Sequence, residues 1–477
     1  MGPFHDLCYR PDVNPRVVAL GRMSAKSWCR VSLALSLSVS CVLATRVLSQ
    51  SNASAPPSNP PTEIVEWLRT SAIPLKTTNP EAELNDMSQL VSVVGNARIV
   101  AMGEATHGTR EFFQMKHRML EFLVEKMGFT VFAIEANWPE SLAVNDYALN
   151  GKGDPATALA GMYFWTWNTE EVLDMIRWMR TYNEDPAHDR KVQFLGFDMQ
   201  TTRVAVSNVD EYLEKVDPHE RQTAELVLAP LADEREYRRR PRKVHVETAE
   251  GIKSLLDFFD EHRRKYVAAS SDKQWALARH NLEIIKQAAE LYSRSPALRD
   301  PYMAENVKWI LDNEPPGTKM MLWAHNGHVS TANSRMGSVL RRMYGQEMVV
   351  CGFSFYEGSF QAVSGVGDWL QDFVVGPAPP DTLDSALAET GLPLFAIDVR
   401  RASSNDAVHR WLGIAHRMRT IGAGYNGLLP SSTYLPEVVP EEFDVIFLVK
   451  RTTPARRSPN LPKVMDPELI SEPRGGV

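Results

Sequence analysis

The sequence predicts an α/β fold in which helices flank a mainly parallel sheet. Short apolar runs recur along the 477-residue chain, bounded by glycine or polar residues, as is typical of strands covered on both faces. Helical stretches, with apolar positions three and four residues apart, alternate with the first of these runs. A long stretch without strand signals then predicts an all-helical insertion, at about residues 203–312, which we expect to act as a lid over the site.

The elements follow in chain order from the same patterns. The predicted strands are Ile99–Met102, Phe129–Ile134, Val192–Phe197, Met320–Trp323, Met348–Phe355, Leu394–Val399 and Val445–Val449. The predicted helices between the early strands are residues 110–127, 138–149 and 169–182. Within the insertion, helical periodicity covers residues 218–230, 246–267 and 273–294. Asn168 and Asp300 are expected to cap the helices that follow them.

The first 49 residues have the features of a secretory signal peptide. Lys26 and Arg30 precede the apolar run of residues 31–45, and small residues suited to a signal peptidase lie at 47–49. The run is short for a membrane span, so we expect an exported protein, periplasmic or secreted, with no stable membrane span after cleavage. Either Met1 or Met23 is the expected start.

Beyond the signal peptide, one large domain is expected. Residues 50–62 are rich in serine, proline and asparagine and predict a flexible spacer. Residues 63–455 then form the catalytic domain, and the Pro- and Arg-rich residues 456–477 predict a disordered tail. A lipoprotein anchored through Cys41 is less favoured, because Ser38 stands where an aliphatic residue is usual.

Composition excludes two classes of protein. The chain is 44% hydrophobic, which excludes a disordered chain, and its net charge of −7 argues against nucleic acid as a partner. Three of its four cysteines lie in the expected signal peptide, which leaves Cys351 on a predicted strand. A lone cysteine at such a position is expected to be a small buried hydrophobe rather than a nucleophile.

Titratable side chains follow three of the predicted strands at the point where each strand ends. Glu104 and His107 follow the first strand, Glu135 follows the second, and His325 and His328 follow the strand that ends at residue 323. The carboxyl ends of parallel strands are where ligands bind in α/β proteins. These five residues are therefore the main candidates for chemistry.

Lys116 lies on the apolar stripe of the helix expected at residues 110–127. An unpaired ammonium in a protein core is costly, so this lysine must meet a carboxylate or extend to the surface. Glu104 and Glu135 are the candidate partners. The alternative is a lysine that snorkels at the edge of the helix, without any part in the site.

The ordered motifs of this chain resemble those of the erythromycin esterases. The motifs are Gly103-Glu-Ala-Thr-His-Gly108, Phe132-Ala-Ile-Glu-Ala136, Gly196-Phe-Asp198, Arg299-Asp300-x-x-Met303-Ala-x-Asn306 and Ala324-His-Asn-x-His328. The resemblance runs from about residue 63 to about residue 455. It implies a hydrolase of a small-molecule ester or macrocyclic lactone, as in macrolide resistance, although a fold does not fix the substrate. Lys116 stands where we expect an arginine in characterised members.

The residues favour hydrolysis by an activated water, because no Gly-x-Ser-x-Gly motif supplies a nucleophile. We expect His107 to be the general base and Glu104 to orient it. Lys116, His325 or His328 would then stabilise the oxyanion or protonate the leaving group. Glu135 is expected to orient a second base, to bind a cation or to pair with Lys116.

A second group of residues is expected to bind the substrate. Residues 163–167 form an aromatic cluster that is either a platform for a bulky substrate or part of the core. Asp198 is either an orienting residue or a helix cap. The candidate substrate-binding residues are Trp165, Trp167, Arg110, Asp198 and Arg299.

Two alternative functions remain open from the sequence. Glu104, His107, Glu135 and His325 could hold a divalent metal in a hydrolase of amide or other bonds, and the fold also resembles that of Tiki-type membrane metalloproteases. No local His-x-x-x-His pair is present, so we expect that no cofactor is required. The third candidate is a non-catalytic binding protein of the envelope, which would have no need of paired bases. The oligomeric state is open.

Overall fold

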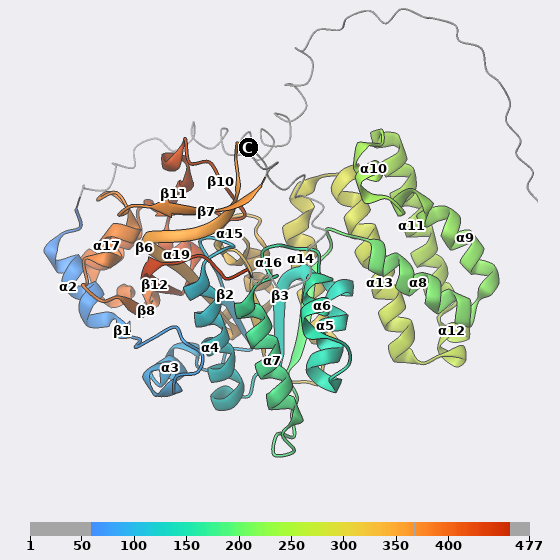
Figure 1. Cartoon of the computed structure of the whole chain (residues 1–477), viewed down its shortest axis with the longest axis horizontal. Coiled ribbons are helices and arrows are strands. Elements are labelled where there is room, and N and C mark those ends of the chain that lie inside the picture. The colour runs from blue at the N-terminus through green and yellow to red at the C-terminus, as the bar shows by residue number, and fades with distance from the viewer. Residues whose placement is uncertain (1–58, 367–368, 458–477) are drawn as a thin grey trace, which may run out of the picture. The chain divides into compact units, whose positions relative to one another are not determined.

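A sheet with helices on both faces forms the centre of the fold (Figure 1). The computed structural model describes residues 59–366 and 369–457, and within them ten strands form this sheet. The strand order is β1-β8-β12-β6-β2-β5-β3-β4, and β7 and β10 pair with β6. The six strands from β12 to β4 run parallel, whereas β1, β7 and β8 pair antiparallel with their neighbours.

The strands of this sheet are β1 Ile73–Pro74, β2 Ile99–Met102, β3 Val131–Asn137, β4 Gln193–Asp198, β5 Met320–Trp323, β6 Met348–Ser364, β7 Leu370–Val375, β8 Leu394–Asp398, β10 Gly424–Tyr425 and β12 Val445–Thr452. A separate pair consists of β9 His416–Arg419 and β11 Tyr434–Glu437. The predicted α/β class and all seven predicted strands are confirmed. The sequence pattern missed β1, β7 and β9–β11, and it missed the second half of β6.

The helices around the sheet are α2 Thr62–Ser71, α3 Leu90–Val94, α4 Arg110–Met127, α5 Trp138–Asn150, α6 Pro155–Ala160, α7 Glu170–Glu184, α14 Arg299–Asp312, α15 Asn326–Val329, α16 Met336–Tyr344, α17 Leu383–Ala388, α18 Asp406–Leu412 and α19 Val439–Glu442. The helices of the insertion are α8 Arg203–Val216, α9 Pro218–Leu228, α10 Glu234–Arg239, α11 Arg242–Glu261, α12 Arg263–Ala269 and α13 Asp272–Ser293.

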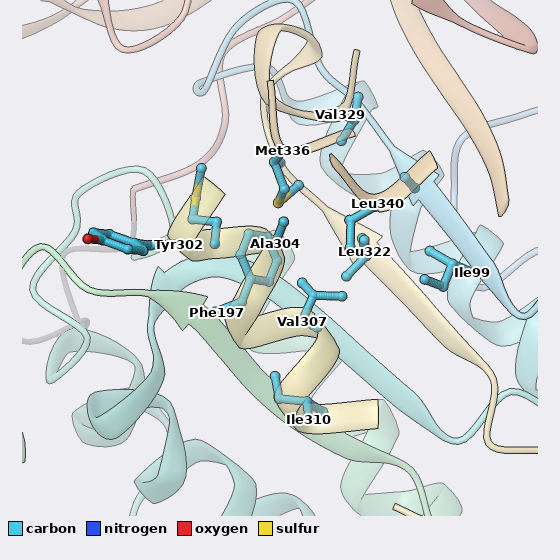
Figure 2. Close-up of a cluster of buried hydrophobic side chains, with 14 of the residues drawn as sticks. Ile99, Phe197, Tyr302, Ala304, Val307, Ile310, Leu322, Val329, Met336 and Leu340 are labelled. Carbon is cyan, nitrogen blue, oxygen red and sulfur yellow. The ribbon is translucent and has the colours of Figure 1, made fainter. Parts of the chain in front are cut away.

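Two apolar layers cover the two faces of the sheet. Alternate residues of one strand point to opposite faces, so Ile99 packs in one layer and Val100 in the other. Figure 2 shows the first layer, where Val307 of α14 and Leu340 of α16 lie near Ile99 and Leu322. Burial on both faces explains why the strands are continuous apolar runs.

Polar side chains of α5 close the outer edge of the sheet at β4. The amide of Phe194 donates to Asn145 Oδ1 at 3.0 Å, and the amide of Gly196 donates to Ser141 Oγ at 2.7 Å. An open strand edge invites pairing with other chains. These two bonds satisfy outward-facing donors of β4 and so protect that edge.

The all-helical insertion is present, with corrected boundaries. The helix expected over residues 246–267 divides at His262 into α11 and α12. The predicted caps were wrong: Thr169, not Asn168, caps α7 by accepting from the amide of Val172, and Asp300 lies inside the first turn of α14. α8 contacts α5 and α13 contacts α14, and the insertion belongs to the same compact unit as the sheet. Its role as a lid stays a prediction.

The signal peptide, Cys41 and most of the expected spacer and tail lie outside the described residues. Among the residues that the structure does describe, no helix has both the length and the apolar character that a membrane span needs. The predictions of export and of a disordered tail therefore stay predictions.

Candidate active site

Loops at the carboxyl ends of β2, β3 and β5 bring the five candidate residues together. These strands are neighbours in the sheet, in the order β2-β5-β3. The loop after β2 carries Glu104 and His107, Glu135 lies within the end of β3, and His325 and His328 follow β5. The parallel arrangement places all these strand ends at one edge of the sheet, as the sequence predicted.

Glu104 is the centre of this site. Its side chain is fully buried. Oε1 accepts a hydrogen bond from His107 Nδ1 at 2.7 Å, while Oε2 accepts from Lys116 Nζ at 2.5 Å and from Trp323 Nε1 at 2.8 Å. Three donors therefore surround one buried carboxylate, which satisfies its charge without water.

Lys116 is completely buried, so the alternative of a snorkelling lysine was wrong. Its pairing with Glu104 confirms the first of the two predicted partners. The ammonium also lies over the rings of Trp323, at 4.5 Å from the centroid, and Phe353, at 5.1 Å. Burial, opposed by Glu104, lowers the pKa of Lys116 to about 8.

His107 is fixed in orientation by its bond to Glu104. With Nδ1 donating to the carboxylate, Nε2 is the basic nitrogen of the neutral ring. Within the described residues Nε2 has no hydrogen-bond partner. The ring packs against Trp167, at 5.7 Å between centroids, and against His325, at 5.2 Å. Its backbone amide donates to the carbonyl of Gly422.

His325 is held as a neutral ring with a defined tautomer. Burial, together with His107 and His328, holds the pKa of His325 well below its usual value. Nδ1 accepts from the amide of Gly327 at 3.1 Å, so the proton of the neutral ring is on Nε2. This buried Nε2 makes no hydrogen bond of normal geometry among the described residues, although the backbone carbonyl of Ala105 is near enough to raise the pKa of the ring slightly. It is therefore an available donor beside His107.

Glu135 binds the backbone of the next loop and an arginine. Oε2 accepts from the amide of His325 at 2.9 Å, and Oε1 accepts from Arg299 Nη2 at 2.7 Å. Arg299 also donates to both oxygens of Asp198, at 3.2 and 2.6 Å. Burial raises the pKa of Glu135, but His328 and Arg299 outweigh it and hold that pKa well below its usual range. Lys116 is thus not the direct partner of this carboxylate.

His328 lies between two carboxylates. Nδ1 donates to Asp300 Oδ1 at 2.8 Å, and Nε2 lies 3.2 Å from Glu135 Oε1 and 3.1 Å from Arg299 Nη1. Burial lowers the pKa of His328, but Glu135 and Asp300 outweigh it and raise that pKa to about 9. Both nitrogens of the His328 ring have side-chain partners, whereas in His325, within the described residues, only Nδ1 has a hydrogen-bond partner of normal geometry, the amide of Gly327.

The other predicted substrate-binding residues have different surroundings. Trp165 and Trp167 are buried, and Trp167 donates to the carbonyl of Glu135 at 3.0 Å, which favours core packing over an exposed platform. Arg110 lines a separate cleft of 1290 Å³ between α4 and α7, with Nε 3.7 Å from Glu171 Oε1. The structure therefore does not bring Arg110 to the histidines. Contact of these residues with substrate stays a prediction.

Sequence reasoning missed two partners in this site. Trp323 donates a hydrogen bond to Glu104. The sequence pattern predicted only that this tryptophan ends a buried strand. Asp300 was expected to be a helix cap, whereas its carboxylate accepts from His328 and from the amide of Met336. Its position in the Arg299-Asp300 motif was the available signal.

The donor groups do not fit a metal centre in this arrangement. Glu104 and Glu135 each direct their oxygens at cations or N–H donors, which leaves neither carboxylate free to act as a ligand. Within residues 59–366 and 369–457, no group of three or more His, Cys, Asp or Glu side chains is arranged to hold a metal. Cys351 is buried, and burial raises the pKa of its thiol.

The site contains a histidine held by a carboxylate at the carboxyl ends of parallel strands, which is an arrangement suited to general-base catalysis. The sequence profile of the erythromycin esterase family matches residues 124–452. The chain therefore belongs to the erythromycin esterase family, and membership supports a hydrolase. Glu104, His107 and Lys116 lie before the matched range, so their roles depend on the geometry above.

Individual relatives are distant. Erythromycin esterase type II of Escherichia coli is 25% identical over 343 residues, which cover 62% of this chain and 78% of the relative. The putative hydrolase YbfO of Bacillus subtilis (strain 168) is 23% identical over 430 residues, which cover 82% of this chain and 91% of the relative. At these identities the relatives do not fix the substrate of this chain.

Solved structures show the same fold. A Bacillus cereus protein aligns with a TM-score of 0.74 at 28% identity, over 83% of this chain and 98% of its own. A mutant of the erythromycin esterase EreC in its open conformation aligns with a TM-score of 0.61 at 16% identity, over 81% of this chain and 97% of its own. The second likeness shows the fold alone.

Proposed function

We propose that this protein is an exported hydrolase that cleaves an ester bond, including that of a macrocyclic lactone, with a water activated by His107. The observation that carries the proposal is the 2.7 Å bond from His107 Nδ1 to Glu104, which leaves Nε2 as an unpartnered base beside His325. A base held by a carboxylate and open on its other nitrogen is suited to general-base catalysis.

In the proposed reaction, His107 Nε2 takes a proton from water as the water oxygen bonds to the ester carbonyl carbon. The Nε2–H of neutral His325 donates to the oxyanion that forms. When the C–O bond breaks, protonated His107 returns its proton to the leaving alkoxide. The products are a carboxylic acid and an alcohol, and His107 ends in its starting form.

Lys116 and Trp323 serve this step through Glu104. Their hydrogen bonds to Oε2 hold the carboxylate in place, while Oε1 faces His107. A fixed carboxylate also stabilises the imidazolium that forms when His107 accepts the proton. Glu135 acts indirectly, because it accepts a hydrogen bond from the backbone amide of His325 and so positions that residue.

The test is a substrate screen with purified protein against macrolide lactones, simple lactones and aryl esters, with and without a chelator. We expect turnover of at least one ester or lactone that survives chelation. A rate that is lost with chelator and restored by a divalent metal would replace this proposal with the metal-dependent alternative. If no ester or lactone is cleaved, the result would favour a non-catalytic binding protein or a hydrolase that acts on another type of bond.

Replacement of His107 by asparagine should abolish most of the expected turnover, and the matched control for that variant is His188→Asn. This histidine is stacked on Tyr182, at 3.7 Å between ring centroids, and its Nδ1 contacts the carbonyl of the same residue. Its replacement should leave the rate unchanged, because none of its described contacts reaches the strand-end loops.

A further inference from the structure

A second cleft runs beside edge strand β4, and its lining contains none of the histidines described above. Its volume is 830 Å³, and α5, α13 and α14 form its walls. Three tryptophans line it: Trp138 from α5, Trp275 from α13 and Trp309 from α14. Trp275 and Trp309 are half-buried, and the Arg263 guanidinium covers one face of the Trp275 ring at 4.9 Å from its centroid.

The back of this cleft is aromatic and uncharged. The rings of Trp138 and Trp309 lie nearly perpendicular, at 82° and 5.3 Å between centroids. His280 stacks on Trp309 at 3.7 Å and packs its ring against Trp138 at 4.5 Å. Burial, followed by the nearby Arg279, lowers the pKa of His280 to about 3, so this ring is neutral. The stacked rings fix the position of the Trp309 indole.

Two ring nitrogens near the cleft lack a hydrogen bond within the described part of the chain, one in the lining residue Trp138 and one in His280, which packs on Trp309 and is not part of the lining. Trp138 Nε1 and His280 Nε2 are buried and have no partner among the described residues. Buried polar atoms are nearly always paired in proteins, so an ordered water is the expected partner of each of these two atoms. The inner wall of the cleft is therefore aromatic, and the polar groups open to a ligand lie at the rim.

The rim of this cleft carries amide side chains, and its charged side chains have a slightly negative net charge. Asn145 uses its Oδ1 to accept from Phe194, which leaves its amide nitrogen available, and the side chains of Gln193 and Glu314 have no partner among the described residues. Arg263 pairs with Asp272 at 2.7 Å. The remaining charged lining residues are Asp146, Lys273 and Glu314. This balance does not favour a phosphate or another anion.

We propose that this cleft binds a short neutral oligosaccharide. A sugar ring has an apolar C–H face that stacks on an indole, and hydroxyl groups that pair with amides and carboxylates at its edge. The lining offers both kinds of group, and the volume lies in the range of small-molecule sites. The acidic rim disfavours nucleotides, which would also stack on tryptophan.

This site is separate from the proposed chemistry. Gln193, which lines the cleft, begins β4, and Asp198, which binds Arg299 at the strand-end site, ends it. The two residues are roughly 16 Å apart along the strand. Binding of sugar therefore does not depend on His107.

The test is calorimetric titration of the purified full chain with the neutral trisaccharides cellotriose, maltotriose and tri-N-acetylchitotriose. We expect at least one trisaccharide to bind, and Trp309→Ala to weaken that binding at least tenfold. Trp178→Ala is the matched control, because Trp178 is a half-buried tryptophan that lines the other, polar cleft. His107→Asn should bind sugar as the parent does, whatever its effect on hydrolysis.

Trp309→Ala removes the ring stacked on His280, so Gln193→Ala and Glu314→Gln test the rim without disturbing that wall. Both should weaken binding while the melting temperature stays within a few degrees of the parent. The proposal is overturned if none of the three trisaccharides binds, if Trp309→Ala binds like Trp178→Ala, or if adenosine monophosphate binds in their place.

Discussion

Glu104 is fully buried and accepts three hydrogen bonds, and each donor has a different task. The His107 bond sets the direction of the base, the Trp323 bond fixes the carboxylate, and the Lys116 bond supplies the balancing charge. A buried carboxylate that loses one charged partner is strongly destabilised, whereas an exposed one is barely affected. Substitution at Lys116 therefore measures how closed the site is.

Lys116→Met should cost on the order of 3 kcal/mol in unfolding free energy or in transition-state binding, because it leaves Glu104 without a cation. Chemical denaturation and steady-state kinetics measure the two terms. Lys126→Met on the same helix is the control, since Lys126 is exposed and pairs with exposed Glu125. If both variants melt and turn over like the parent, the buried pair contributes nothing.

His328 should make stability depend on pH. Burial lowers its pKa, but Glu135 and Asp300 raise it from 6.5 to about 9, so the folded state keeps a proton that the unfolded chain loses between these values. The stabilisation is fully present below pH 6.5 and is lost as the pH rises through 9. At about 1.4 kcal/mol per pKa unit, its size is on the order of 3 kcal/mol.

The measurement is the difference in unfolding free energy between the parent and His328→Gln, at intervals from pH 6 to pH 9.5. We expect this difference to fall steadily with rising pH. A difference that stays constant would mean that His328 gains no proton on folding.

At the residue scale, the sequence was informative where a side chain type demanded a partner. A lysine on an apolar stripe predicted a carboxylate nearby, and Glu104 is that carboxylate. The motif that contains Asp300 indicated a place in the site, but its pairing with His328 depends on how α14 meets the loop after β5 and was not predicted. The same holds for Arg299, whose bridge between Glu135 and Asp198 joins three separate elements.

At the scale of elements, the loop after β2 must pass very close to β6. A Cβ atom added at Gly108 would lie 2.1 Å from the backbone oxygen of Gln361, so only glycine fits. This glycine adjoins His107, and its carbonyl accepts from the amides of Gln361 and Ala455. The close approach therefore fixes the loop that carries the base.

Gly108→Ala should displace this loop, cost about 2 kcal/mol or more in stability and lower kcat. Thermal melting and kinetics on a cleaved ester give both values. Gly424→Ala is the control, because its Cβ would meet its nearest neighbour at an ordinary 3.8 Å. Parent-like kinetics in Gly108→Ala would show that the loop tolerates the shift.

The elements that the sequence missed share one physical feature. β7, β11 and parts of the second half of β6 are partly exposed, so their residues mix polar and apolar types, and β9 is mostly buried but consists largely of polar residues. The strands at the centre of the sheet are buried on both faces and read as apolar runs. Periodicity therefore found the parallel centre of the sheet and missed the strands at its margin.

At the scale of the whole molecule, export is the prediction that the N-terminal sequence makes. Lys26, Arg30 and the apolar run that follows predict cleavage near Gln50. N-terminal sequencing of the protein recovered from its native host should find a mature start between about residues 45 and 55. Exported protein that begins at Met1 or Met23 would contradict the proposed cleavage.

The claim on which the whole account depends is that His107 is the base of a hydrolytic site. The most direct measurement is kcat for His107→Asn on an ester or lactone that the parent cleaves. We expect a loss of roughly 10²- to 10⁴-fold, mainly in kcat with KM little changed, in a variant that melts like the parent. A folded His107→Asn variant that keeps the parent kcat would contradict the mechanism.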